Sequence, residues 1–261
     1  MIASEPQGLS YAGAVATPSV YLRGGAKMRV LAVGCHPDDL EIGCGGTLNR
    51  YVLEGAEVHM CHVASGDLGH AVIMPPELRE IRTAEAERSG RLLGATRVYS
   101  LDVGDTYVHE FDEAVVDALA EIIRSVDPNV IITHSEHDYM RDHVQVGNLA
   151  FNASFVASVV HRATESPATG IAPVFSMDTL AGMSFEPTHY VDISATIETK
   201  LEALACHESQ IRWMAEHDHI DFLDFVRTCS KYRGYQAGVA YAEGFRPWLR
   251  WPRTSTQHLL P

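Results

Sequence analysis

The chain has 261 residues, of which 46% are hydrophobic, and it carries a formal net charge of −14. This length is sufficient for one sizeable core, so we expect a single domain. The negative charge argues against a polyanionic partner, because proteins that bind nucleic acid or anionic membranes present basic surfaces. We therefore expect no nucleic-acid partner. We also expect no membrane insertion, because the apolar runs are shorter than the ~18 to 20 residues that cross a bilayer.

Residues 1–27 are rich in Ala, Gly, Ser and Pro and lack the basic start and apolar core of a secretion signal. They are predicted to form an N-terminal extension that precedes a single domain over residues 28–261. The five cysteines show no C-x-x-C spacing, so neither a disulfide framework nor a zinc knuckle is indicated. A cytoplasmic location is the simpler expectation.

Apolar strands and helical patterns alternate along the chain from residue 28. In the first half, the predicted strands are 28–33, 57–63, 98–101 and 129–133, and the predicted helices are 45–54, 76–93 and 111–126. In the second half, we expect a helix at 143–161, a loop at 164–173, strands at 174–177 and 189–193, and helices at 197–205 and 222–231. This series predicts an α/β fold with a Rossmann-like, mainly parallel sheet flanked by helices in three layers.

A polar cluster, His36-Pro-Asp-Asp-Leu-Glu41, follows the first predicted strand directly. Loops at the carboxyl ends of parallel strands form the sites of such folds. A tight turn can direct His36 and Asp39 toward one point while Asp38 faces elsewhere. Helix capping would account for one carboxylate, but not for three beside a histidine. Because three carboxylates repel one another at a partly buried strand end, a divalent metal is the natural completion.

Three glycines, Gly43, Gly45 and Gly46, follow this cluster and have a superficial similarity to a dinucleotide-binding fingerprint. Their spacing differs from that fingerprint, and the carboxylates before them would repel a pyrophosphate. We expect these glycines to allow close packing of a helix beneath the site instead.

A second polar cluster, residues 134–143, follows the strand predicted at residues 129–133. His143, in the first turn of the next helix, is the best candidate for a third metal ligand. The remaining roles are open to His134, His137, Asp138 and Asp142. Two histidines and one aspartate with an open position describe a catalytic zinc site, which polarises a carbonyl and lowers the pKa of bound water toward ~7. Asp38 is then placed to take the proton of that water.

These residues resemble a known family. The segment from His36 to Glu41 is similar to the His-Pro-Asp-Asp-x-Glu signature of the PIG-L/LmbE-like zinc-dependent N-deacetylases, and Asp142-His143 is similar to the end of their His-Pro-Asp-His motif. The resemblance extends over residues 28–245, and the other similar segments are Arg82-x-x-Glu85, Lys200-x-x-Ala-Leu and His207-x-Ser-Gln210.

The resemblance implies a Rossmann-like sheet, one zinc ion per chain held by His36, Asp39 and His143, and Asp38 as the general base. It implies a small-molecule substrate that is an N-acetylated glycoside or an antibiotic or thiol precursor. It also favours a homo-oligomer.

The chain departs from the family at Met140-Arg141, where relatives usually have His-Pro. Methionine can neither stabilise an oxyanion nor protonate a leaving amine. We expect His137 to take over this work, because an imidazole can donate a proton whereas Arg141 can only stabilise charge. The predicted catalytic residues are Asp38, His137 and Asp142, and the predicted substrate contacts are Arg82, Met140 and Arg141.

The predicted function is hydrolysis of the acetamide of an N-acetylated amino sugar or glycoside to a free amine and acetate. One alternative is an amidase that acts on another acyl amine or on a thiol conjugate. The other is a metal-bearing binding protein that does not turn over a substrate.

Overall fold

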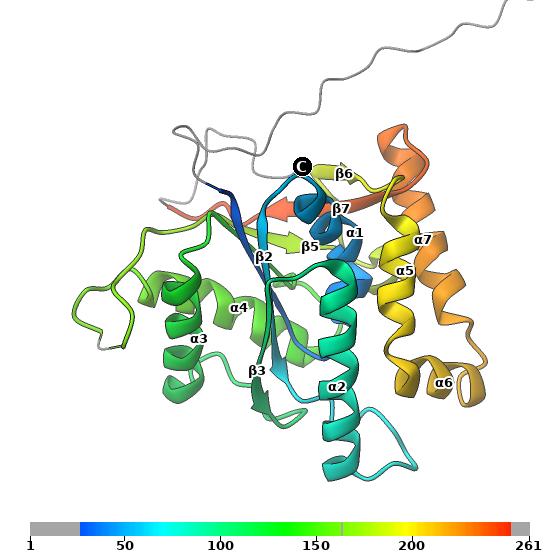
Figure 1. Ribbon diagram of the computed structural model, residues 1–261, viewed down its shortest axis with the longest axis horizontal. Helices are drawn as coiled ribbons and strands as arrows, with labels where there is room; N and C mark the ends of the chain where they lie inside the picture. The colour runs from blue at the N-terminus through cyan, green and yellow to red at the C-terminus, as the bar shows by residue number, and fades with distance from the viewer. Residues whose placement is uncertain (1–26, 163, 252–261) are drawn as a thin grey trace, which may run out of the picture.

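A computed structural model describes residues 27–162 and 164–251 (Figure 1). The predicted N-terminal extension, apart from residue 27, lies outside the described residues. The strands are β1 (Arg29–Gly34), β2 (Glu57–Ala64), β3 (Arg97–Val103), β4 (Val130–Thr133), β5 (Val174–Met177), β6 (His189–Asp192) and β7 (Ala242–Pro247). The helices are α1 (Asp39–Leu53), α2 (Pro75–Leu93), α3 (Glu113–Val126), α4 (Arg141–Val156), α5 (Ile197–Ala205), α6 (Glu208–Glu216) and α7 (Phe222–Ala237).

The strands form one sheet in the order β3-β2-β1-β4-β5-β7-β6. The first five strands in this order are parallel, whereas β7 runs antiparallel to both of its neighbours. This confirms the predicted mainly parallel sheet. The interior strand β1 pairs with β2 on one side and β4 on the other, so the loops after β1 and β4 emerge next to each other.

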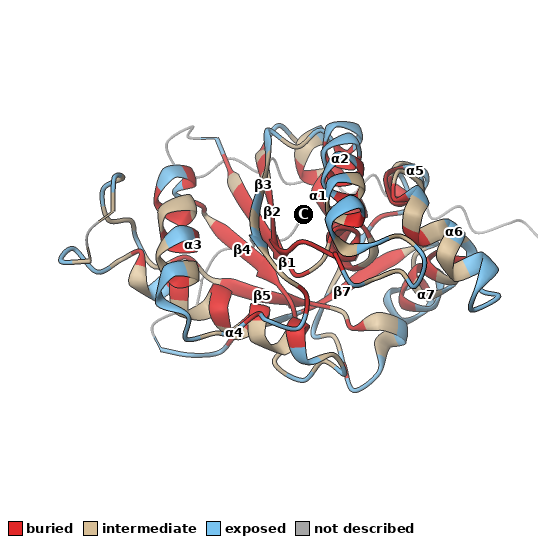
Figure 2. Ribbon diagram, turned by 90° about the horizontal axis from the view of Figure 1, so that it is seen from below, coloured by how far each residue is buried: buried red, intermediate tan, exposed pale blue. Residues whose placement is uncertain are grey.

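Helices cover both faces of the sheet and produce the predicted three layers (Figure 2). One core contains apolar side chains from α1, α2, α5 and α7, and the other contains side chains from α3 and α4. Successive residues of β1 alternate between these cores, with Val30 in the first and Leu31 in the second. Both faces of the strand are therefore buried, which explains why its sequence is a continuous apolar run.

Several element boundaries differ from the predictions. Helix α1 begins at Asp39 and not at Gly45, because its first-turn carboxylates are favoured at a helix N-terminus and its glycines pack closely. A Cβ atom on Gly46 would lie 2.8 Å from the Ile193 side chain. Helix α4 begins at Arg141 and ends at Val156, earlier than predicted. Helix α6 and strand β7 were not predicted, and β7 includes a glycine and a proline that weaken its strand pattern.

Within the described residues, no helix is both long enough and apolar enough to cross a membrane.

Candidate metal centre

The loops after β1 and β4 bring His36, Asp39 and His143 together at the carboxyl ends of the two strands. One potential ligand atom from each of the three residues lies within 4.8 Å of the others. His36 precedes α1, Asp39 is the first residue of α1, and His143 lies in the first turn of α4. Two segments about one hundred residues apart therefore converge on one point because their strands are neighbours in the sheet.

Asp39 occupies the middle of this cluster. Its Oδ1 lies 3.3 Å from Nε2 of His143, and its Oδ2 lies 3.4 Å from Nδ1 of His36. The backbone N–H of His36 also donates a hydrogen bond of 2.7 Å to Asp39 Oδ2. Although burial raises the pKa of Asp39, the charge of His143 holds it well below its usual range. The carboxylate is therefore ionised and available as a ligand.

His143 directs its Nε2 toward Asp39 in the cluster and its Nδ1 toward Asp138. Its Nε2 is buried and has no hydrogen-bond partner. Its Nδ1 lies 3.2 Å from Asp138 Oδ1. Such an arrangement is typical of a metal-binding histidine, whose second nitrogen donates to a carboxylate that orients the ring. Burial opposes the charged form, but Asp39 and Asp138 raise the pKa of His143 to about 9.

The ring of His36 has a comparable arrangement. Its Nδ1 faces Asp39, while its Nε2 lies 3.7 Å from Asp142 Oδ2 and 3.8 Å from Asp105 Oδ1. Asp142 is held in place by a 2.7 Å hydrogen bond from the backbone N–H of Thr106. Two imidazole nitrogens and one carboxylate, with a buried nitrogen among them that makes no hydrogen bond, form a donor set that fits zinc.

Asp38 lies next to this donor set but faces a different partner. Its Oδ2 lies 3.1 Å from Nη2 of Arg82. Its φ of 117° is outside the region favoured by residues other than glycine, and its side chain does not cap α1. Burial raises the pKa of Asp38 to about 6, against the opposing effect of the Arg82 charge. Such strain and a raised pKa are typical of functional carboxylates.

Arg82 is buried beneath the loop that follows β2. Its guanidinium donates hydrogen bonds to the carbonyl oxygens of Pro37 and Gly66, the latter at 3.1 Å. A Cβ atom on Gly66 would lie 2.6 Å from Arg82 Nη1, and one on Gly69 would lie 2.7 Å from the same nitrogen. These glycines therefore let the loop close around the guanidinium, which in turn positions the carboxylate of Asp38.

The third carboxylate of the first motif does not face the metal cluster. Glu41 accepts a hydrogen bond from the Ser89 hydroxyl and lies 3.4 Å from Nε2 of His207. Both Glu41 and His207 are fully buried. The sequence argument that three carboxylates share one site was thus wrong for Glu41. Its partners come from α2 and the start of α6, which the local sequence pattern does not indicate.

His134 packs against the metal cluster. Its Nε2 accepts a 2.9 Å hydrogen bond from the backbone N–H of Cys35, and its ring stacks on that of His143 with centroids 4.1 Å apart. Burial lowers the pKa of His134, so its ring is neutral.

Asp105 accepts hydrogen bonds from the backbone N–H groups of Gly66 and Leu68 and thereby stabilises the loop around Arg82. Asp105 was missed from sequence, although it follows a parallel strand as the other clusters do.

The cluster lies in a cavity of about 640 Å³. Among the predicted residues, its lining includes His36, Asp38, Asp39, Arg82, Met140, Arg141, Asp142 and His143. His137 is not among the lining residues; its side chain is 68% exposed and lies 3.7 Å from Glu136. The position of His137 therefore argues against the predicted catalytic role. Tyr139, which was not predicted, lines the cavity, with its ring 6.1 Å from that of His143.

Together, the parallel α/β sheet and the donor cluster at its strand ends define an α/β protein with a candidate metal-dependent active site. Residues 31–154 match the PIG-L family, described as GlcNAc-PI de-N-acetylase. The chain therefore contains a PIG-L family domain, and most of the relatives it matches are named as deacetylases.

The similarity to individual proteins extends well beyond the matched segment. The chain is 29% identical to diacetylchitobiose deacetylase of Thermococcus kodakarensis, over 84% of this chain and 82% of that protein. It is 25% identical to 4-oxalmesaconate hydratase of Pseudomonas putida, over 83% of this chain and 87% of that protein. The solved structure of N,N'-diacetylchitobiose deacetylase from Pyrococcus horikoshii superposes with a TM-score of 0.72 and 28% identity, over 84% of this chain and 82% of that one.

Proposed function

We propose that this chain is a zinc-dependent N-deacetylase that hydrolyses the acetamide of an N-acetylated amino sugar or glycoside to a free amine and acetate. The observation that carries the proposal is the buried Nε2 of His143, which makes no hydrogen bond and lies 3.3 Å from Asp39 Oδ1, beside His36, in a cavity of substrate size. The proposed ligands of one zinc ion per chain are His36, Asp39 and His143. When bound, zinc would supply a Lewis acid for the amide carbonyl and lower the pKa of a water molecule.

Asp38 is the proposed general base. The adjacent Arg82 guanidinium, 3.1 Å away, favours the ionised carboxylate and holds it next to the donor cluster. Because burial raises the pKa of Asp38 to about 6, the carboxylate is basic enough to accept a proton from water and is still largely ionised near neutral pH. Asp138 orients the ring of His143 and Asp142 orients the ring of His36, each at the ring nitrogen that does not face Asp39.

Tyr139 is the proposed donor toward the departing amine or the oxyanion. Met140 cannot donate a proton, and His137 lies outside the cavity lining. Tyr139 lines that cavity, and burial raises the pKa of its phenol, so its hydroxyl stays protonated. A protonated phenol can stabilise a developing oxyanion.

The test combines elemental analysis of the purified protein with acetate release from a panel of N-acetylated glycosides, before and after removal of metal by a chelator. We expect about one zinc ion per chain and acetate release that is lost with the metal and restored by zinc. Release of a different acid from N-acyl amines or thiol conjugates would favour the alternative amidase. Stoichiometric zinc without any product would favour the binding protein.

We also propose a cytoplasmic homo-oligomer. All five cysteines are free, which fits a reducing compartment. Light scattering on the eluting protein would measure the assembly directly.

A further inference from the structure

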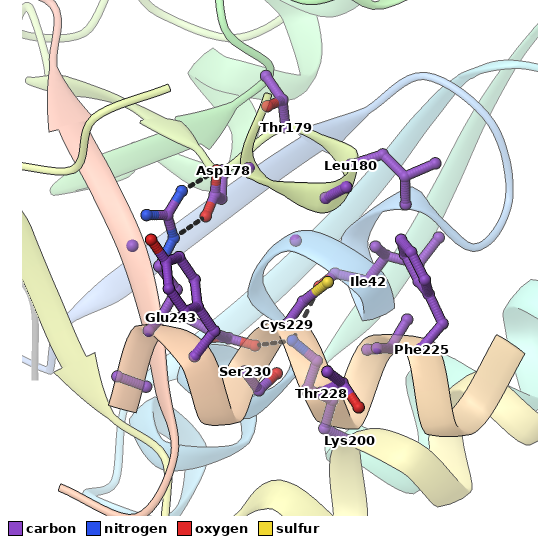
Figure 3. A pocket seen from close by; sticks show the side chains of 18 residues that line it. Ile42, Asp178, Thr179, Leu180, Lys200, Phe225, Thr228, Cys229, Ser230 and Glu243 are labelled. Carbon is purple, nitrogen blue, oxygen red and sulfur yellow. Dashed lines mark hydrogen bonds and ion pairs between the residues drawn. The ribbon is translucent and has the colours of Figure 1, made fainter. Parts of the chain in front are cut away.

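A second cavity, of about 300 Å³, adjoins the one that contains the donor cluster (Figure 3). We call it the side cavity. It is formed by α1, α5, α7, β7 and the segment of residues 178–182 after β5. Ile42, Gly43, Asp178 and Leu180 line both cavities. Ile42 and Gly43 lie one helical turn beyond Asp39, so the two cavities are neighbours and share part of their lining close to the donor cluster.

The first pair of charges in the side cavity is satisfied within the protein. Lys200 Nζ lies 2.6 Å from Glu243 Oε1 and donates a 2.8 Å hydrogen bond to the carbonyl oxygen of Ile42. Glu243 also accepts hydrogen bonds from the backbone N–H groups of Gly46 and Thr47, at 3.0 and 2.8 Å. Both side chains of the ion pair are almost fully buried. Neither charge therefore requires a ligand.

The second pair of charges in the side cavity, Arg233 and Asp178, is also satisfied within the protein. Arg233 donates to both carboxylate oxygens of Asp178, at 2.5 and 3.1 Å, and to the carbonyl oxygen of Phe185. The remaining guanidinium nitrogen donates to Gln236. Burial raises the pKa of the Cys229 thiol, which stays neutral. The side cavity thus carries two positive and two negative side chains that neutralise each other.

The rest of the lining is mainly hydrocarbon. Figure 3 shows Ile42, Leu180 and Phe225 along one side of the side cavity, and Val226 and Ala242 also belong to its lining. A charged ligand here would lose its hydration without finding a free partner, which is costly. An apolar group would gain free energy from leaving water. The chemistry of the side cavity therefore favours a neutral hydrocarbon group.

We propose that the side cavity binds a hydrocarbon arm of the substrate while the acetamide or other amide lies at the donor cluster. This inference rests on the proposed function and specifies its substrate class as amino sugars that carry an alkyl or aryl arm. At roughly 30 Å³ for each water-sized group, a cavity of about 300 Å³ has room for a short alkyl chain or an aryl ring. The arm can be the aglycone of the glycoside or the acyl part of the amide, and both present the same chemistry to the side cavity.

Two homologous series separate these sources. The first is alkyl glycosides of N-acetylglucosamine from methyl to octyl, and the second is N-acyl glucosamines from acetyl to octanoyl. Because each buried methylene contributes up to a fourfold gain, kcat/KM should rise by roughly two- to fourfold per carbon in one series. A rise of kcat/KM in the first series would assign the aglycone to the side cavity. A rise in the second series would assign the acyl group to it. Flat profiles in both series, with the methyl glycoside hydrolysed, would overturn the proposal.

A filling variant tests the location of the arm. Cys229→Phe on α7 narrows the side cavity and should bring the octyl-to-methyl ratio of kcat/KM close to one. Thr228→Trp, at an exposed lining position of the same helix, is a second filling variant in case the first does not fold. Lys231→Trp is the matched control, because Lys231 is exposed on α7 and does not line the side cavity. An unchanged ratio in a folded filling variant would refute the assignment.

Failure of the proposed function is distinguishable from failure of this inference. If the zinc-loaded protein hydrolyses neither series, the deacetylase proposal fails, and calorimetry then tests the side cavity alone. Tighter binding of octyl than of methyl N-acetylglucosaminide, lost in Cys229→Phe, would support the inference. Equal binding of the two glycosides would overturn it.

Discussion

Replacement of Asp138 tests whether its carboxylate orients His143 as a zinc ligand. The Asp138 carboxylate is 2% exposed, lies 3.2 Å from Nδ1 of His143, and accepts a 3.0 Å hydrogen bond from the backbone N–H of Met140. Asparagine keeps an oxygen acceptor at this position but removes the charge, whereas alanine removes both. Loss of a carboxylate behind a metal-binding histidine typically weakens metal affinity by about 10- to 100-fold, equivalent to about 1.4 to 2.7 kcal/mol.

We expect Asp138→Asn to weaken zinc binding by about tenfold and Asp138→Ala by up to about 100-fold. Competition with a fluorescent zinc chelator measures both dissociation constants, and acetate release at saturating zinc separates lost metal from lost catalysis. Glu136→Gln is the control, since Glu136 lies in the same loop but pairs with Arg250 at the surface, at 3.1 Å. Wild-type zinc affinity in folded Asp138→Ala would refute the reasoning that Asp138 orients His143 for zinc binding.

Asp38→Asn should retain zinc and lose about 10²- to 10⁴-fold in turnover, the usual contribution of a general base; near-normal turnover with zinc bound would assign the proton to another group. His143→Ala should lose zinc and activity together in elemental analysis and acetate assays, because a site with three protein ligands has none to spare. Tyr139→Phe should lower turnover on the order of 10²-fold without loss of zinc, while His137→Ala should leave turnover unchanged, and the opposite pattern would return the role to the imidazole. Because Asp39 and Asp138 raise the pKa of His143 to about 9, zinc must displace a proton near neutral pH. Apparent zinc affinity should therefore fall by at least about tenfold per unit as pH decreases below that value, and a pH-independent affinity in calorimetry would contradict this sign.

The described residues account for most of the predicted elements, because continuous apolar runs and helical periodicity are local properties. Strand β5 and helix α5 have the predicted bounds. The prediction of a site at the ends of β1 and β4 follows from the parallel sheet, which places carboxyl ends on one edge. The start of α1 was predicted too late, because the glycines that disfavour an isolated helix are packed here against other elements.

The sequence by itself determined the class of fold and the two segments that carry the donor atoms. Their residue types and their place directly after apolar strands are sufficient for that conclusion. Only the tertiary structure decided which polar side chains meet. It pairs Asp38 with Arg82, directs Glu41 to His207, and leaves His137 at the surface. These outcomes depend on strand order, loop closure and side-chain direction between segments far apart in the chain, and no local pattern of residues encodes them.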